Sequence, residues 1–391
     1  MSELVILSAR RTPIGAFQGV FATTTASQLG AAAARGALTD SGLAGEDIDE
    51  VIFGCVLMAG QGQAPARQAT LGAGLPNRIP TTTINKMCGS AMKAVMMGCD
   101  QLAAGNVNVV LAGGFESMTN APYLLPKARA GYRMGHGEII DHMFFDGLQN
   151  PYDGKMMGHF ADATAAKYGF TREQQDAFTA ESVRRAQAAV ASGAFKAEIT
   201  PVTVKTRKGE QIIDGDETPG TCDLGKISTL KPAFNKDGTV TAASSSSISD
   251  GGAALVVTTA DHARKLGHKP LARVVAYASH AHEPEWFTTA PGGALKKVLT
   301  KAGWQAKEVD LYEINEAFAV VAMAAMHDVG IAHDKVNVNG GACALGHPIG
   351  ATGARILTTL IYALKARGLK RGVASLCIGG GEATAMAIEL L

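Results

Sequence analysis

One cysteine of this sequence lies where a helix is predicted to begin, a position that can activate a thiol. Cys88 follows the polar run 81–83 and precedes residues 91–104, which are apolar on nearly every side. Such a helix is typically buried in a large core, and the free N–H groups and dipole at its N-terminus favour a thiolate. Gly89 lets another group approach the sulfur closely. Cys88 is therefore a candidate nucleophile, and the alternative is an inert packing cysteine.

Three further residues have types and settings that suit catalysis. His347 lies among glycines and directly before Pro348, and Cys377 follows the predicted strand 373–376 and precedes three glycines. Asn315 opens the segment Asn-Glu-Ala-Phe, which leads into an apolar predicted helix. Each residue has a structural alternative: His347 as a turn residue, Cys377 as a core cysteine, and Asn315 as a helix N-cap. Only their proximity in space would make them a catalytic group.

An internal repeat predicts that proximity. Residues 37–43 resemble 298–304, residues 111–116 resemble 377–382, and residues 4–9 resemble 273–278, all in the same order and about 260 positions apart. Two related halves, with the middle of the chain inserted after the first, are the simplest explanation. The same spacing carries Cys88 onto His347, so both follow equivalent strands. Loops at the carboxyl ends of strands then face one another across a pseudo-twofold axis.

The elements that position these residues indicate an α/β fold with two βαβαβ-type halves and an inserted loop domain. Strands are predicted at 4–9, of the type buried in parallel sheets, and at 51–56 and 107–112, with a helix at 26–40 and a turn at 113–116. The predicted units are residues 1–119 (first half), 120–248 (inserted loop domain), 249–268 (return to the first half) and 269–391 (second half).

One helix stands out inside the inserted segment. Thr171 and Gln174 form a capping box, a stripe of apolar residues follows, and Gly193 ends the helix. The stripe consists of Phe178, Val183, Ala186 and Val190. Residues 205–220 are charged and rich in turn formers, which predicts a surface position.

Composition excludes several classes of protein. The 391 residues carry a net charge of +1, which provides no basic face for nucleic acid. The longest apolar run, residues 317–326, is too short to span a membrane. Six cysteines without a CxxC pair indicate reduced thiols in a cytoplasmic protein and no structural zinc.

Several long blocks resemble the thiolase family. They are NKMCGSAMKA at 85–94, NEAF at 315–318, NVNGGACALGHPIGATGARI at 337–356 and CIGGGEA at 377–383, with GGFESMTNAPY at 113–123 and GQAPARQ at 62–68. The resemblance spans nearly the whole chain. It implies an acyltransferase that makes or cleaves 3-ketoacyl-CoA, with coenzyme A as co-substrate and no permanently bound cofactor. It also implies acyl-CoA and CoA as partners, and a homodimer or homotetramer.

The resemblance further implies the role of each residue. Cys88 attacks the thioester carbonyl and His347 takes its proton, whereas Cys377 is the acid and base of the carbon–carbon step. The enolate oxygen is stabilised by His347 and by a water that Asn315 holds. The main-chain N–H groups of Cys88 and Gly379 hold the oxygen of the acyl-enzyme.

The resemblance also implies which residues contact the substrate, and the sequence departs from the family pattern at two positions. The residues that the resemblance places along the pantetheine and acyl channel are Ser246, Phe318, Met157, Ala317 and Met156. Ser244 stands where the family usually has asparagine, which puts the geometry of this loop in question. Met156 replaces the histidine of biosynthetic members, which predicts a more apolar acyl pocket and substrates longer than acetoacetyl-CoA.

Two other functions remain open from the sequence. A condensing enzyme that uses a carrier protein shares the duplicated fold and the nucleophilic cysteine, but it is not expected to carry Cys377 before three glycines. A non-catalytic acyl-CoA or lipid-binding protein could also use this fold. Labelling of Cys88 by acetyl-CoA with release of free CoA would separate the three.

Overall fold

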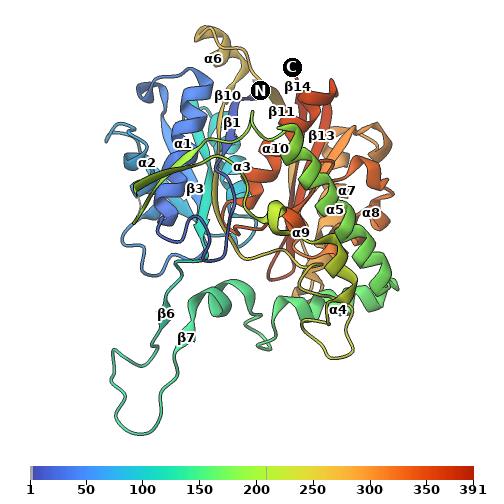
Figure 1. The fold of residues 1–391 in the computed structure, drawn as a ribbon. Coiled ribbons are helices and arrows are strands. Elements are labelled where there is room, and N and C mark those ends of the chain that lie inside the picture. The colour runs from blue at the N-terminus through green and yellow to red at the C-terminus, as the bar shows by residue number, and fades with distance from the viewer. Residues whose placement is uncertain (1–2, 208) are drawn as a thin grey trace.

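A computed structural model describes residues 3–207 and 209–391, and it shows two layered halves that share one mixed sheet (Figure 1). Among these residues the main sheet has ten strands in the order β12-β13-β14-β11-β1-β10-β5-β3-β4, with β2 paired to β10. Its strands are β1 (Leu4–Arg11), β2 (Gly15–Ala16), β3 (Glu50–Gly54), β4 (Thr81–Ile84), β5 (Val109–Ser117), β10 (Ser249–Thr259), β11 (Ala272–Ala281), β12 (Leu311–Ile314), β13 (Arg371–Ile378) and β14 (Glu382–Leu390). Two small hairpins are formed by β6 (Tyr123–Leu124) with β7 (Ile140–Asp141), and by β8 (Val202–Thr206) with β9 (Gly209–Ile213).

Helices cover both faces of the sheet. They are α1 (Ala26–Ser41), α2 (Pro65–Gly72), α3 (Ser90–Ala103), α4 (Met157–Tyr168), α5 (Arg172–Ser192), α6 (Ala260–Lys265), α7 (Ala290–Ala302), α8 (Ala319–Val329), α9 (Ala342–Leu345) and α10 (Thr352–Arg367). Short helical turns are η1 (Gly45–Asp47), the π-helical η2 (Met143–Leu148), η3 (Thr218–Thr221), η4 (Leu224–Thr229), η5 (Pro284–Thr289), η6 (Ala306–Glu308) and η7 (His333–Lys335).

The pairing of strands confirms the predicted α/β duplication. In the first half β3 runs parallel to β5, which pairs antiparallel with β10, and β10 pairs antiparallel with β1. In the second half β12, β13, β14 and β11 repeat this pattern in the same order. The halves meet where β1 pairs with β11. The outermost strand of the first half, β4, has as its counterpart a single bridge between Tyr312 and Val336.

Two local predictions were wrong. The first strand was expected in a parallel sheet, but β1 runs antiparallel to both neighbours; its run is apolar because helices cover both faces of the sheet. The predicted turn at 113–116 lies inside β5. A Cβ atom on Gly113 would lie 2.0 Å from the carbonyl oxygen of Ala253, so glycine is needed for close pairing with β10. The similarity of 111–116 to 377–382 is therefore out of structural register.

Helices α3 and α10 form the central layer between the two halves, whereas α1 and α2 cover the outer face of the first half and α7 and α8 that of the second (Figure 1). The predicted apolar helix after Cys88 is α3, and most of its side chains are buried. A Cβ atom on Gly98 would lie 3.0 Å from Val110 Cγ1, so this glycine allows the helix to pack closely on β5. The packing of this central layer thus fixes the start of α3, next to Cys88, and the start of α10, which follows His347.

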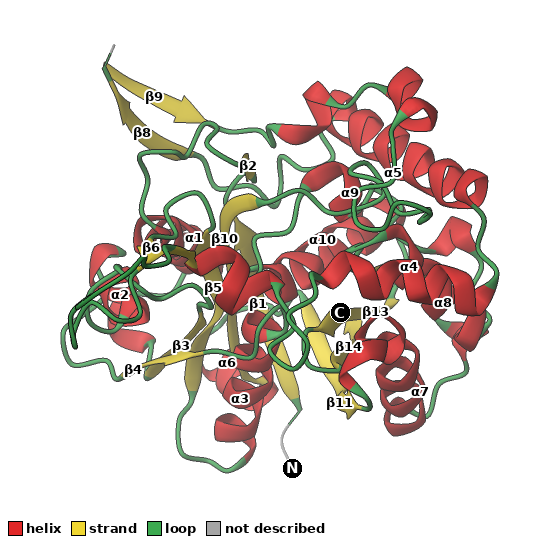
Figure 2. Cartoon of the chain, turned by 90° about the horizontal axis from the view of Figure 1, so that it is seen from below, coloured by secondary structure: helices red, strands yellow, loops and turns green. Residues whose placement is uncertain are grey.

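The inserted segment contains the predicted capped helix, α5. Thr171 and Gln174 form the capping box and Gly193 ends the helix with φ 74°, as predicted. Val190 was wrongly placed in the buried stripe, since 43% of its surface is exposed. Figure 2 shows β8–β9 as a projecting hairpin, which agrees with a surface position for much of 205–220, although Ile213 and Pro219 are buried. The β6–β7 arm extends away from the body in Figure 1.

Strand β10 lies between β1 and β5, where a return of the chain to the first half would place it. The four unit boundaries remain a prediction. Within residues 3–207 and 209–391, no helix combines the length and the apolar character needed to cross a membrane.

Candidate active site

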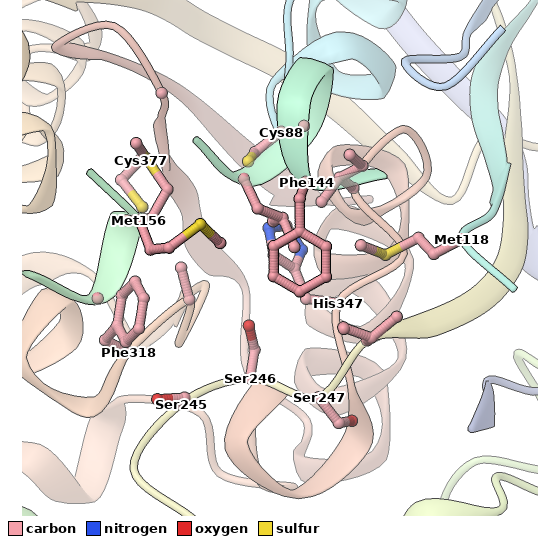
Figure 3. Close-up of a pocket in the computed structure, with 18 of the residues that line it drawn as sticks. Cys88, Met118, Phe144, Met156, Ser245, Ser246, Ser247, Phe318, His347 and Cys377 are labelled. Carbon is pink, nitrogen blue, oxygen red and sulfur yellow. The ribbon is translucent and has the colours of Figure 1, made fainter. Parts of the chain in front are cut away.

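One pocket of about 240 Å³ brings together residues from both halves and from the inserted segment. Nine of the ten predicted site residues line it: Cys88, His347, Cys377, Gly379, Ser246, Phe318, Met157, Ala317 and Met156. Figure 3 shows the sulfur atoms of Cys88 and Cys377 and the imidazole of His347 around the same space. The tenth, Asn315, does not line the pocket. The repeat therefore predicted correctly that these distant loops meet.

Tight local structure positions Cys88 between β4 and α3. The main-chain N–H of Lys86 donates to Ser90 Oγ (2.8 Å), and that hydroxyl donates to the carbonyl of Met87 (2.7 Å). A Cβ atom on Gly89 would lie 2.3 Å from Ile378 Cδ1, so glycine lets the end of β13 approach the cysteine. Cys88 and Cys377 are thereby neighbours in space.

The helix start predicts a lowered pKa for the Cys88 thiol, but in the structure the pKa is raised. Burial raises its pKa to about 11, even though the main-chain N–H groups of Gly379 and Cys88 contact the sulfur and favour the thiolate. The negative charge of Glu116 raises the pKa further. Loss of hydration outweighs the helix N-terminus here. The resting residue is a thiol, so a role as nucleophile would require that its proton leave.

His347 is arranged to receive that proton. Its Nδ1 lies 2.6 Å from Thr352 Oγ1, and this hydroxyl donates its single proton to the carbonyl of Pro348 (2.9 Å). Nδ1 must therefore carry the hydrogen, which leaves the lone pair on Nε2. Nε2 is buried and has no hydrogen-bond partner among the described residues. Burial, with the nearby Arg355 cation, lowers the pKa of His347 to about 3, so the ring is a neutral base.

Cys377 is the second-last residue of β13, and its side chain is buried where it lines the pocket. Burial raises the pKa of its thiol well above the ordinary value, and the neighbouring Cys88 adds to this effect. Cys377 is therefore a protonated acid at rest and, once ionised, a strong base. The two cysteines have distinct settings: main-chain N–H groups of two residues contact the Cys88 sulfur, whereas the Cys377 sulfur is contacted by its own main-chain N–H.

Asn315 directly follows β12, two residues before the lining residue Ala317, and is almost fully buried. Neither its side-chain oxygen nor its nitrogen has a hydrogen-bond partner among the described residues. Buried amides normally find such partners. This side chain therefore has free capacity to hold a water or a substrate group.

Ser244, which departs from the family motif, makes hydrogen bonds that hold its own loop in place. Its hydroxyl accepts the main-chain N–H of Thr241 (2.8 Å), and its carbonyl accepts the N–H of Ala319 (2.8 Å). Two residues on, the N–H of Ser246 donates to the carbonyl of Ala317 (3.0 Å). The loop of residues 244–248 is thus fixed against the start of α8, and it forms one wall of the pocket (Figure 3).

Comparison with known proteins agrees with this geometry. The family model for the thiolase N-terminal domain matches residues 4–261, and that for the thiolase C-terminal domain matches residues 268–390. The chain belongs to the thiolase family. An acetyl-CoA acetyltransferase of Allochromatium vinosum is 49% identical over 392 residues, with 99% of each chain covered. Acetyl-CoA acetyltransferase 2 of Arabidopsis thaliana is 48% identical over 100% of this chain and 97% of its own.

A solved structure supports the fold of this thiolase. The crystal structure of the Bacillus anthracis acetyl-CoA acetyltransferase has a TM-score of 0.98 and 40% identity, and it covers 100% of this chain and 99% of its own.

Sequence reasoning missed much of the pocket of this thiolase. The apolar lining that it did not identify consists of Met118, Phe144, Leu148, Phe234, Ile248, Phe287 and Ile349. Phe144 and Leu148 lie on η2, and π-helical turns are frequent at functional sites. No sequence periodicity marks such a turn. Thr352 was also missed, although a hydroxyl five residues after His347 was a usable signal. In the described part of the chain, no cluster of potential ligands could hold a metal ion.

Proposed function

We propose that this thiolase transfers an acyl group between coenzyme A and Cys88, and thereby makes or cleaves 3-ketoacyl-CoA. The observation that carries the proposal is the convergence of two differently buried thiols and a neutral imidazole on one apolar pocket. Relatives named acetyl-CoA acetyltransferase support acetyl-CoA as a substrate. Coenzyme A acts as co-substrate, and no permanently bound cofactor takes part.

In the first half-reaction, the Cys88 sulfur attacks the thioester carbonyl as His347 Nε2 takes its proton. The bond from Cys88 to the acyl carbon forms, the bond from that carbon to the CoA sulfur breaks, and CoA leaves with the proton from His347. A neutral histidine with a free Nε2 suits this role. The N–H groups of Cys88 and Gly379, which contact the sulfur, would stabilise the negative carbonyl oxygen. Loss of one such donor typically costs about 3–4 kcal/mol of activation free energy.

In the second half-reaction of synthesis, Cys377 gives its thiol proton to His347 Nε2 and its thiolate then takes a proton from the α-carbon of acetyl-CoA. The resulting carbanion forms a bond to the acyl carbon, the bond from that carbon to Cys88 breaks, and the Cys88 sulfur recovers a proton from His347. Cleavage reverses these steps, and the Cys377 thiol then protonates the departing enolate. The high pKa of Cys377 keeps the thiol protonated at rest, so that it has a proton to give, and makes its thiolate a strong base. The enolate oxygen would be held by His347 and by a water on the unpaired amide of Asn315.

The lining of the pocket supports acyl groups longer than acetyl. Met156, Met157, Phe318 and Ala317 provide apolar walls, and Ser246 is the polar contact proposed for the pantetheine arm. Thiolysis of 3-ketoacyl-CoA substrates of increasing length tests this part. A Met156→His variant should lower activity on the longer substrates more than on acetoacetyl-CoA. Equal losses for all lengths would contradict the proposed role of Met156.

Acylation itself is the decisive test of the function. We expect acetyl-CoA alone to label the protein at Cys88 and to release one free CoA for each chain, as measured by mass spectrometry of peptides. Absence of a label with every acyl-CoA would favour a binding protein. A label that appears only with a carrier protein would favour a condensing enzyme, although no finding supports either alternative.

We also propose that the protein is a homodimer or homotetramer in the reducing cytoplasm. The β6–β7 arm exposes large apolar side chains, including Met134 at 96% and Ile139 at 68%, and β4 is an edge strand of the sheet. The six free cysteines fit a reducing compartment. Light scattering should give a mass above one chain, and Met134→Asp should lower it whereas Ile212→Asp on the β8–β9 hairpin should not. A monomeric wild type would refute the assembly.

A further inference from the structure

Glu116 is a buried carboxylate near the end of β5 that the reaction described above does not use. It is fully inaccessible to solvent and does not line the pocket. Its Oε2 accepts the main-chain N–H groups of Val56 and Gly350, both at 3.0 Å. Its Oε1 accepts the N–H of Leu57 (3.1 Å) and the S–H of Cys55 (3.5 Å). Four neutral donors on one side chain suit a carboxylate rather than a carboxylic acid.

These bonds connect the loops that carry the two reacting groups. Gly350 lies three residues after His347, whereas Val56 belongs to the loop after β3. The carbonyl of Val56 accepts the side-chain N–H of Asn85 (3.5 Å), and the Asn85 oxygen accepts the N–H of Met87 (2.9 Å). A continuous hydrogen-bonded chain therefore runs from the histidine loop through Glu116 to the residue before Cys88.

The backbone is shaped to permit this connection. A Cβ atom on Gly350 would lie 2.6 Å from the carbonyl oxygen of Phe115 and 2.7 Å from Glu116 Oε2. A Cβ atom on Gly114 would lie 2.1 Å from the carbonyl oxygen of Gly350. Both glycines are needed for the two main chains to approach this closely. The contact joins the first half to the second half directly beside the pocket.

We propose that Glu116 is a positioning residue of the acylation step, and that its carboxylate holds the His347 loop at a fixed place relative to the Cys88 loop. The inference rests on the proposed function. A misplacement of about 1 Å between reacting groups can slow a reaction by about a hundredfold. A side chain that connects the two loops, one from each half, is well placed to prevent such a shift.

The charge of Glu116 gives the proposal an independent readout. Titratable groups that face Cys88 are His347, Cys377 and Glu116. The negative charge of Glu116 raises the pKa of Cys88. Burial raises the pKa of Glu116 itself to about 7, while the hydrogen bonds from Leu57 and Val56 oppose that effect. Removal of the charge should therefore lower the pH at which Cys88 reacts with iodoacetamide.

The test uses two substitutions that separate charge from reach. Glu116→Gln keeps the length of the side chain and removes the charge, whereas Glu116→Asp keeps the charge and is too short to contact both loops. We expect both to slow single-turnover acylation by acetyl-CoA by about tenfold or more with little change in KM. Only Glu116→Gln should shift the midpoint of the iodoacetamide profile downward. Thermal melting verifies that each variant is folded.

A matched pair at Cys55 keeps the proposal testable if the Glu116 variants do not fold. Cys55→Ala removes one donor from Glu116 Oε1, whereas Cys55→Ser retains a donor. We expect Cys55→Ala to slow acylation and Cys55→Ser to restore it. Glu116 variants that acylate Cys88 within about twofold of wild type would overturn the proposal, as would Cys55→Ala and Cys55→Ser variants that behave alike. A wild-type chain that is never acylated would instead refute the proposed function.

Discussion

Replacement of Thr352 by valine tests whether one hydroxyl fixes the proton-accepting form of His347. The substitution keeps the shape of the side chain at the start of α10 and replaces the Oγ1 hydroxyl with a methyl group. Pro348 loses a donor, but its carbonyl still accepts the N–H groups of Ala351 (2.9 Å) and Thr352 (3.0 Å). His347 Nδ1 loses its one hydrogen-bond partner among the described residues. The histidine is therefore affected more than the carbonyl, which keeps two donors.

The expected magnitude follows from the charge that His347 acquires. The bond from Nδ1–H to Thr352 is neutral in the resting enzyme and becomes charge-assisted when the ring takes the Cys88 proton. Bonds to charged groups contribute about 1.5–3 kcal/mol, against about 1 kcal/mol for neutral ones. Only the gain over the neutral bond, about 0.5–2 kcal/mol, affects the barrier, so acylation should slow by about twofold to thirtyfold. If the ring instead moves its proton to Nε2, it cannot accept another proton there, and the rate also falls.

Quenched-flow measurement of acyl-enzyme formation with saturating acetyl-CoA gives the rate directly. Thr352→Ser is the matched control, because it retains the hydroxyl, and it should acylate at a rate close to that of wild type. KM should change little in either variant, since Thr352 does not line the pocket. A folded Thr352→Val variant that acylates as fast as Thr352→Ser would refute the assignment of the proton to Nδ1.

Three further predictions follow from the pocket. Cys88→Ser should abolish formation of the acyl-enzyme, whereas Cys377→Ser should retain it and lose carbon–carbon exchange; loss of acylation in both variants would contradict the division of roles. Alkylation of free Cys88 by iodoacetamide should rise with pH toward a midpoint near 11, because its pKa is raised and the thiolate forms late; a midpoint below the ordinary value of about 8.5 would show that the helix N-terminus outweighs burial. Gly379→Ala should fold, since its Cβ atom would meet only Met157 Sδ at 3.9 Å, yet slow acylation by intruding into the pocket. Gly381→Ala should instead lower the melting temperature, because glycine there has φ 88° and a Cβ atom would lie 2.3 Å from the carbonyl oxygen of His282; equal melting temperatures for the two alanine variants would contradict this reasoning.

Much of the architecture could be read from the sequence because it is local or repeated. The α5 helix was predicted from its capping box and its terminal glycine, which are properties of adjacent residues. The duplication was predicted from recurring segments, and it located the meeting of Cys88 with His347 without any knowledge of strand order. Register was less accessible: residues 113–116 looked like a turn, but close pairing with β10 requires glycine inside β5. A glycine in the sequence indicates that another group packs closely against the main chain, but it does not identify that group.

Sequence alone determined which residues are candidates for the chemistry, because the proposed nucleophile, base and second thiol follow from residue type and from the repeat that relates their loops. Only the tertiary structure decided the protonation of those groups. Cys88 lies beside a helix start, which favours the thiolate, but burial raises its pKa instead. The free Nε2 of His347 and the unpaired amide of Asn315 likewise depend on the folded structure, in which no described residue forms a hydrogen bond with these atoms. Burial is a property of the whole packed molecule, and no local pattern of residues reveals how much water each group loses.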